Sequence, residues 1–283
     1  MEPIKESTPL VLVTSSPHMH CGLTIGKSMR EVMLALVPAI IASVYYFRMS
    51  AAIVMVTCVV SAIVFETICN KVMHKPNTVQ DGSAALTGLL LAMCLPASMP
   101  PLFAAMGSMF AIVVGKAVFG GLGCNIFNPA HIGRAILLAS FPQQMTNWVL
   151  PATAAASDAV STATPLAVMR ATEKIWQAGG AASAAKLPDL MNLFWGNVGG
   201  SLGETCVPAL VLGGLYLIYK KLIDWRIPVF YLVTVAILTG VYGAVMGYPS
   251  TFPLYHLFAG GLMIGAFFMA TDWVTSPITK KGK

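Results

Sequence analysis

Charged residues are scarce in this sequence. Asp, Glu, Lys and Arg make up 10% of its 283 residues, and hydrophobic residues make up 57%. A soluble globular domain carries about 25% charged residues, so this chain has too few to cover a surface in water. The shortage excludes an ordinary soluble domain and indicates apolar surface that faces lipid or lies between membrane helices.

Cysteine is also sparse, and its six positions include no C-x-x-C pair. The spacing argues against a disulfide framework, and against a zinc or iron–sulfur site made by this chain alone. We therefore expect no metal site. Cysteines in apolar stretches pack as small core residues. For Cys124, in a glycine-rich segment, we favour the same packing role, and contact with a cofactor is the alternative.

Base-reading motifs are missing as well, although the net charge is +6. The basic residues stand at the ends of apolar segments, where they set membrane orientation and mark cytoplasmic loops. We therefore expect no nucleic acid partner, and both termini in the cytoplasm. The basic clusters are Lys27 and Arg30, Lys71 and Lys75, Lys220, Lys221 and Arg226, and the C-terminal tail.

Long apolar runs are what the sequence does contain. The first two, at 32–47 and 51–68, are separated by Arg48. Later runs are shorter than the roughly 20 residues that cross a bilayer, and proline or glycine interrupts them. Such breaks are tolerated at membrane depth where protein or a cavity satisfies the backbone, and discontinuous helices point to binding sites. We predict an all-α polytopic membrane protein with about eight to ten transmembrane helices, including broken half-helices.

Each part of the chain contains a short predicted helix that begins after an acidic residue, then a break marked by proline, and later a Gly-Gly pair. This recurrence suggests a two-fold internal repeat. A polar stretch rich in Ala, Ser, Thr and Gly separates these parts. The predicted organisation is a cytoplasmic arm at 1–31, a first membrane half at 32–141, an extramembrane loop at 142–200, a second membrane half at 201–276 and a cytoplasmic tail at 277–283.

The loop contains the segment 158–166, which reads Asp-Ala-Val-Ser-Thr-Ala-Thr-Pro-Leu. Composition alone favours an ordinary Ser/Thr-rich loop. The order Asp158, Ser161, Ala163, Thr164 is more specific. It resembles the flavinylation signature Asp-x-x-Ser/Thr-x-Ala-Thr/Ser of the RnfD and NqrB family, whose members are membrane components of the Rnf and Nqr complexes.

This resemblance implies that Thr164 carries FMN through a phosphoester bond. A threonine hydroxyl needs an activating partner to act as a nucleophile, and the neighbouring residues supply no self-sufficient base. That agrees with attachment by a separate flavin transferase, as the resemblance implies.

A second segment, 120–130, combines glycines with two asparagines. Gly121 and Gly123 allow close backbone approach to a flat ligand. Asn125 and Asn128 are three residues apart, so on a helical turn both amides would face one way and offer donors and an acceptor. The alternative is a helix break in which the amides satisfy freed backbone groups. The segment resembles the same family, which implies a riboflavin site at these residues.

The resemblance covers almost the whole chain, and the short N-terminal arm favours the Rnf branch. It implies a bacterial inner-membrane protein whose flavin loop faces outward. Further matching segments are 15–18, 81–88, 200–205 and 270–277.

Two acidic residues in or beside apolar segments, Glu66 and Asp272, are candidates for an ion path, because ionisable groups in a membrane are costly and usually functional. The alternative is a place at a helix N-terminus, where a carboxylate is favoured.

The expected function is electron relay through covalent FMN, between ferredoxin and NAD+, coupled to Na+ or H+ movement. The chain would act as one component of an ion-translocating oxidoreductase and would not be catalytic alone. Its partners would be the other Rnf subunits, the flavin transferase and lipid. The rival function is a small-solute channel without a redox cofactor, which broken helices fit equally well. A membrane-embedded transferase fits less well, because the sequence has no paired acidic motif for Mg2+ and diphosphate.

Overall fold

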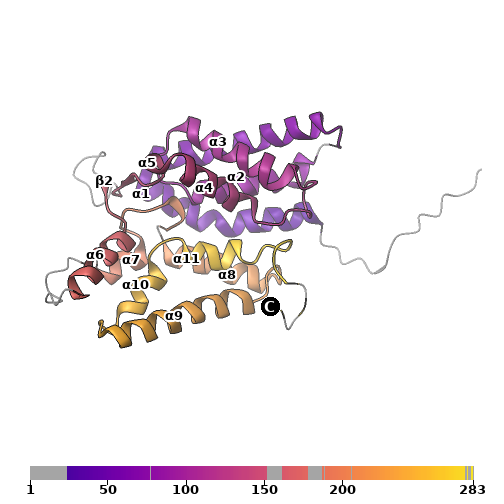
Figure 1. Ribbon diagram of the computed structural model, residues 1–283. Coiled ribbons are helices and arrows are strands. Elements are labelled where there is room, and N and C mark those ends of the chain that lie inside the picture. The colour runs from indigo at the N-terminus through magenta and orange to yellow at the C-terminus, as the bar shows by residue number, and fades with distance from the viewer. Residues whose placement is uncertain are drawn as a thin grey trace, which may run out of the picture.

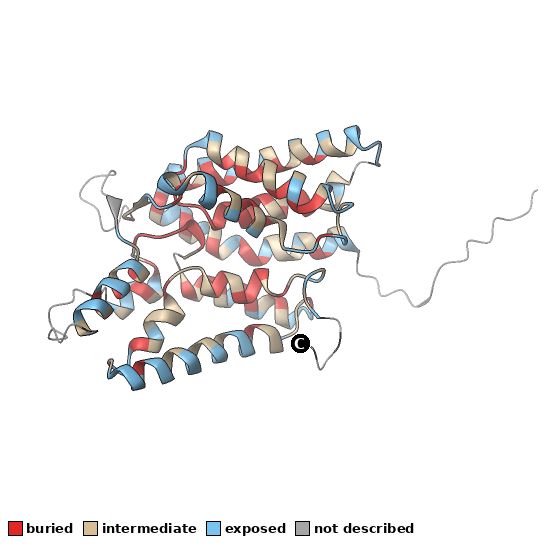
Figure 2. Cartoon of the chain, in the orientation of Figure 1, coloured by how far each residue is buried: buried red, intermediate tan, exposed pale blue. Residues whose placement is uncertain are grey.

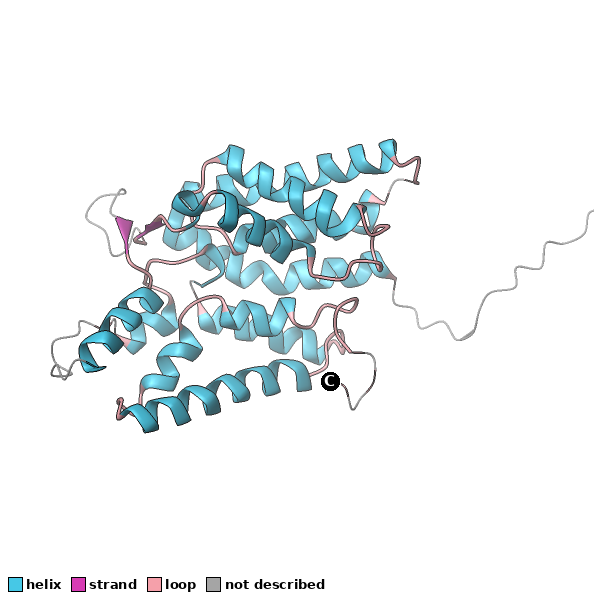
Figure 3. Ribbon diagram, in the orientation of Figure 1, coloured by secondary structure: helices cyan, strands magenta, loops and turns pink. Residues whose placement is uncertain are grey.

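The computed structural model describes residues 24–76, 78–151, 161–177, 187, 189–204, 206–277, 279 and 282. Helices form almost all of its regular structure, and the strands of the described residues are two short pieces at one end (Figures 1 and 3). Together with the apolar composition, this confirms the prediction of an all-α polytopic membrane protein. The two-fold internal repeat stays a prediction.

The longest element, α1 (Ile25–Val72), is two helices joined at a kink. Arg48 has φ 52° and ψ −134°, outside the helical region, and the chain reverses there. Both arms return to the same end of the bundle, since Gly26 lies against Asp81 while Glu66 accepts a hydrogen bond from Thr78, a near neighbour of Asp81 in sequence. Arg48 therefore divides two membrane spans, as the sequence predicted. The first span starts before Val32, because Thr24 caps it.

Two shorter helices, α2 (Ser83–Met93) and α3 (Pro101–Ile112), pack against α1. A third, α4 (Pro129–Ser140), packs against α2 and α3. The π-helical segment η2 (Val113–Ala117) extends α3. Helices α3 and α4 are antiparallel, since Gly115 lies against Pro129 and Gly107 against Leu137. The stretch from Val118 to Gly123 forms turns and does not continue the helix.

The segment between the membrane halves forms small elements at one end of the bundle (Figure 1). They are α5 (Pro142–Met145), β1 (Trp148–Val149), β2 (Ser161–Thr162), α6 (Pro165–Gln177) and α7 (Leu190–Trp195). The two strands pair antiparallel, with Val149 opposite Ser161. The ladder ties the chain on both sides of the polar segment together and places the start of α6 next to it.

The chain then re-enters the bundle through η4 (Leu202–Glu204). The Leu202 amide donates to the Leu95 carbonyl at 3.0 Å, and the Leu202 carbonyl accepts from the Ser43 hydroxyl at 2.6 Å. An isolated bridge joins Pro96 to Ser201. The two broken segments thus satisfy each other's backbone groups inside protein, which is how non-helical backbone survives at membrane depth.

The second half consists of α8 (Val207–Tyr219), α9 (Arg226–Met246), α10 (Phe252–Phe258), α11 (Leu262–Ile264) and the π-helical η5 (Gly265–Met269). Among the described helices, α1 and α9 are long and apolar enough to span a membrane, and α10 with α11 and η5 passes as one span bent by 65°. Helix α9 is mostly exposed (Figure 2), with apolar side chains such as Phe230 and Leu238 on its surface. Such a face suits lipid or another membrane protein.

Candidate functional site

A cavity of about 260 Å³ opens at the end of the bundle where α1 begins and η5 ends. Its wall is mainly apolar, with a few polar groups converging from several elements. This pattern is typical of small-molecule sites, although the volume is at the lower end of their range. The polar groups at the wall are Ser28, Ser83, Thr87, Lys116, Asn125, Asn128, Thr271 and Asp272.

The two asparagines of the glycine-rich segment both line this cavity. Their segment is not helical, so the expected helical turn is absent. Asn128 is the N-cap of α4, and its Oδ1 accepts from the Ala130 amide at 3.0 Å. Asn125 is 6% exposed, and its Nδ2 donates to the Phe127 carbonyl at 3.1 Å. One atom of each amide therefore satisfies backbone, as the alternative interpretation required, and both residues still face the cavity.

The glycines before them have left-handed backbone angles. Gly121 has φ 112° and Gly123 has φ 92°, which side-chain-bearing residues rarely adopt. A Cβ at either position would meet no atom within 4 Å. The chain thus needs these glycines for their backbone conformation rather than for space. Gly123 lines the cavity, whereas Gly121 is not among its lining residues. Cys124 is exposed, contrary to its expected packing role.

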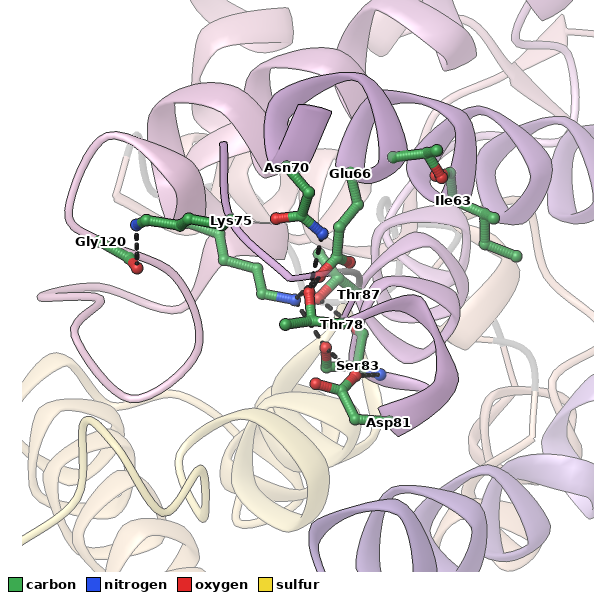
Figure 4. Close-up of polar contacts among 11 residues, drawn as sticks. Ile63, Glu66, Asn70, Lys75, Thr78, Asp81, Ser83, Thr87 and Gly120 are labelled. Carbon is green, nitrogen blue, oxygen red and sulfur yellow. Dashed lines mark hydrogen bonds and ion pairs between the residues drawn. The ribbon is translucent and has the colours of Figure 1, made fainter. Parts of the chain in front are cut away.

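A buried ion pair lies at one side of the cavity. Lys116 Nζ is 2.7 Å from Glu66 Oε1, and the two side chains are 5% and 4% exposed. The same Oε1 accepts from the Thr78 hydroxyl at 2.7 Å, and Lys116 also donates to Ser83 Oγ at 2.6 Å. Figure 4 shows the side chains of Glu66, Thr78 and Ser83 converging. Glu66 Oε2 is buried and finds no hydrogen-bond partner in the part of the chain that the structure describes.

Sequence reasoning selected Glu66 but missed Lys116. The available signal was a lysine two residues after a long apolar run, Leu102–Val114, a pattern that is also typical of an ordinary helix end. The structure places Lys116 inside η2, and π-helical segments occur frequently at functional sites.

The second acidic candidate, Asp272, follows η5 and also lines the cavity. Its carboxylate accepts long contacts of 3.4 Å from the Val274 amide and the Thr275 hydroxyl. Glu66 touches the cavity only through Lys116. One site therefore unites the asparagine pair with both ion-path candidates.

Thr164 lies elsewhere, at the start of α6. Its Oγ1 accepts from the Ala167 amide at 3.2 Å, and its carbonyl accepts from the Val168 amide at 3.0 Å, so it caps the helix. The side chain is half-buried, beside exposed Ala163. Thr164 borders an open depression of about 510 Å³ that is also lined by Arg170 and Lys174.

The other residues of the flavinylation signature are only partly described. Ser161 pairs in the β1–β2 ladder, and Asp158 lies outside the described residues. Within the described part of the chain, no group of three or more His, Cys, Asp or Glu residues could hold a metal ion.

The cavity and Thr164 lie at opposite ends of the bundle. The start of α1 and the end of η5 are at one end, and α6 with the β ladder is at the other (Figure 1). The basic clusters flank the cavity end, since Lys75 donates to the Gly120 carbonyl at 2.6 Å and Lys220 pairs with Glu31 at 3.8 Å.

Comparison with known proteins yields one family. The profile of the NQR2, RnfD, RnfE family matches residues 12–283. The D subunit of the proton-translocating ferredoxin:NAD+ oxidoreductase complex of Clostridium ljungdahlii is 48% identical over 274 residues, which is 96% of this chain and 81% of that protein. The D subunit of the Na+-translocating ferredoxin:NAD+ oxidoreductase complex of Acetobacterium woodii is 43% identical over 274 residues, which is 96% of this chain and 80% of that protein. The D subunit of the ion-translocating oxidoreductase complex of Rhodobacter capsulatus is 40% identical over 293 residues, which is 95% of this chain and 80% of that protein.

Proposed function

The chain belongs to the NQR2, RnfD, RnfE family, and from this premise we propose that it is the membrane protein that relays electrons through flavins in an ion-translocating ferredoxin:NAD+ oxidoreductase complex. The other subunits of that complex are the implied protein partners. The relatives are named for proton translocation in one case and Na+ translocation in another, so the proposal covers either ion.

The surroundings of Thr164 fit a covalently attached FMN. A phosphodiester keeps one negative charge, and the first turn of a helix offers unpaired N–H groups and a positive dipole end to such an anion. Arg170 and Lys174 add two cations to the same depression. The single observation that carries the proposal is this hydroxyl, in the signature order, at the N-terminal end of α6 and beside a depression that Arg170 and Lys174 also line.

The cavity fits a non-covalent flavin such as riboflavin. Its apolar walls suit a flat aromatic ring, and Asn125, Asn128 and Lys116 offer polar groups to the ring's hydrogen-bonding edge. A bound flavin supplies the redox chemistry, while the protein supplies position and electrostatics. Glu66 and Asp272, beside this cavity, are the proposed ion-path residues.

The basic clusters at the cavity end support a cytoplasmic location of that end. Both termini would then be cytoplasmic, and Thr164 would face the outer side of a bacterial inner membrane. A flavin transferase with FAD as donor would modify the hydroxyl there. Exposed apolar helices such as α9 would contact lipid or the other subunits.

The first experiment detects the covalent flavin by in-gel fluorescence of the denatured chain, produced together with a flavin transferase. We expect a fluorescent wild-type band, a dark band for Thr164→Val and a fluorescent band for Thr164→Ser, which keeps the hydroxyl and the cap. Thr162→Val is the matched control and should stay fluorescent. A dark wild-type band would favour the channel, and fluorescence persisting in Thr164→Val would move the attachment to another residue.

The second experiment separates capping from ligand binding at Asn128. Asn128→Asp keeps an oxygen that caps α4 but removes the Nδ2 donor, whereas Asn128→Ala removes both. We expect Asn128→Asp to unfold at nearly the wild-type denaturant concentration but to retain less riboflavin. Asn128→Ala should lose about 1 kcal/mol of stability as well. Unchanged riboflavin content in both variants would exclude Asn128 from the site.

A further inference from the structure

Lys116 contacts both the cavity, which is the proposed riboflavin site, and Glu66, which is a proposed ion-path residue. Its ammonium group lines the cavity and forms the ion pair with Glu66 at 2.7 Å. An ammonium has three N–H donors. Two are accounted for by Glu66 Oε1 and Ser83 Oγ, and the third has no protein partner among the described residues.

We propose that Lys116 is an electrostatic link between the cavity and the Glu66 carboxylate. In this role its positive charge raises the reduction potential of a flavin bound in the cavity, and the charge on Glu66 sets how strongly it does so. The inference rests on the proposed riboflavin site and deepens it, by assigning a residue that couples that site to the ion path.

The charges around Lys116 support this role. Glu66 is buried and compensates Lys116 directly, so neutralising Glu66 leaves the lysine charge fully available to the cavity. The other nearby carboxylates are Asp81, which accepts from Ser83 Oγ at 2.5 Å, and Asp272 on the cavity wall. Neither carboxylate is changed by a substitution of Glu66 or Lys116. A change in potential can therefore be assigned to the pair.

Glu66 also has an oxygen that can take up a positive charge. Its Oε2 atom is buried and has no hydrogen-bond partner among the described residues, so a proton can bind there without displacing Lys116 or Thr78. Coupling between two sites is reciprocal. If a cation on Glu66 favours the reduced form of the cavity ligand, the reduced ligand favours the cation on Glu66 by the same factor. This reciprocity is the physical basis for linking electron arrival to ion uptake in this protein.

The test measures the midpoint potential of riboflavin bound to the full-length chain, produced without flavin transferase so that Thr164 is unmodified. Glu66→Gln, which mimics a protonated Glu66, should raise the potential. Lys116→Met should lower it. We expect each variant to change the ratio of the affinities for reduced and oxidised riboflavin about tenfold or more, which corresponds to about 30 mV for a two-electron couple.

Two further variants complete the design. Lys75→Met removes an exposed lysine that contacts the carbonyl of Gly120, and its potential should match the wild type because solvent screens that charge. The double variant of Glu66→Gln with Lys116→Met removes both buried charges, and its potential should lie below the wild type. If Lys116→Met alone does not fold, the other two variants still test the link, because the double variant should lower the potential and Glu66→Gln should raise it.

The outcomes separate the inference from the proposed function. If the wild type binds riboflavin but Glu66→Gln and Lys116→Met shift its potential in the same direction, or not at all, the electrostatic link is wrong and the riboflavin site stands. If the wild type binds no riboflavin in a saturable manner, the cavity is not a flavin site, and the link falls with it.

Discussion

The buried pair of Glu66 and Lys116 allows a quantitative prediction about stability. At the observed 2.7 Å, two unit charges attract by ~6 kcal/mol if the effective dielectric constant is ~20. The cost of removing both from water offsets most of that attraction. The pair therefore adds little net stability, but deleting one partner strands the other charge in a buried position.

We expect the single variants to unfold more easily than the double variant. Lys116→Met should cost roughly 3–5 kcal/mol, because Glu66 is left uncompensated. Glu66→Gln should cost roughly 1.5–3 kcal/mol, because the glutamine oxygen still accepts from Thr78 while Lys116 loses its counter-charge. The double variant should lie within about 1 kcal/mol of the wild type, since burying two neutral side chains of similar size is often neutral.

The assay is denaturant unfolding of the chain in mild detergent, followed by tryptophan fluorescence. A double-mutant cycle of these variants should yield a coupling energy of roughly 4–8 kcal/mol, which is the sum of the two single losses minus the small change in the double variant. Ser108→Ala provides the matched control. Ser108 is buried on α3, two helical turns before Lys116, so its effect should add to that of Glu66→Gln. Additive losses for Glu66→Gln and Lys116→Met would refute the view that these two charges compensate each other.

Three further predictions follow from helix contacts and from the ion path. Gly88→Ala would place a Cβ 2.5 Å from the Cys58 carbonyl oxygen, so we expect a loss of roughly 1–3 kcal/mol in the same unfolding assay. Gly240→Ala on α9, where a Cβ would approach no atom closer than 3.8 Å, should instead raise the free energy of unfolding by about 0.5–1 kcal/mol. Equal losses of stability for the two glycine variants would contradict the packing. Glu66→Gln in the assembled complex should slow ion transport more than electron transfer, measured side by side in proteoliposomes; equal loss of both would indicate misfolding.

Several features of the fold could be read from local sequence. Scarce charge and long apolar runs indicated membrane helices, because an apolar surface of that size is stable only against lipid or other helices. Arg48, between two apolar runs, marked the reversal within α1. Proline at 96, 100 and 101 marked the break after α2, because a proline ring cannot continue a helix without losing a backbone hydrogen bond.

Other features depended on contacts between distant segments. The stretch from Val118 to Gly123 turns and does not continue the helix, because Gly120, Gly121 and Gly123 adopt positive φ angles. The sequence predicted that the chain returns to the membrane near η4, but not which segments η4 contacts. Its backbone is satisfied by Leu95 and by Ser43, which is 159 residues away from Leu202 in sequence.

The sequence by itself determined that this chain is a helical membrane protein of a known family, and it singled out Thr164, the asparagine pair and the two acidic residues as candidates. Composition and short motifs are local properties, so they can be recognised without knowing the fold. Only the tertiary structure brought Asn125, Asn128, Asp272 and Lys116 to one cavity and paired Lys116 with Glu66, because a buried charge finds its partner through packing between helices and not through spacing along the chain.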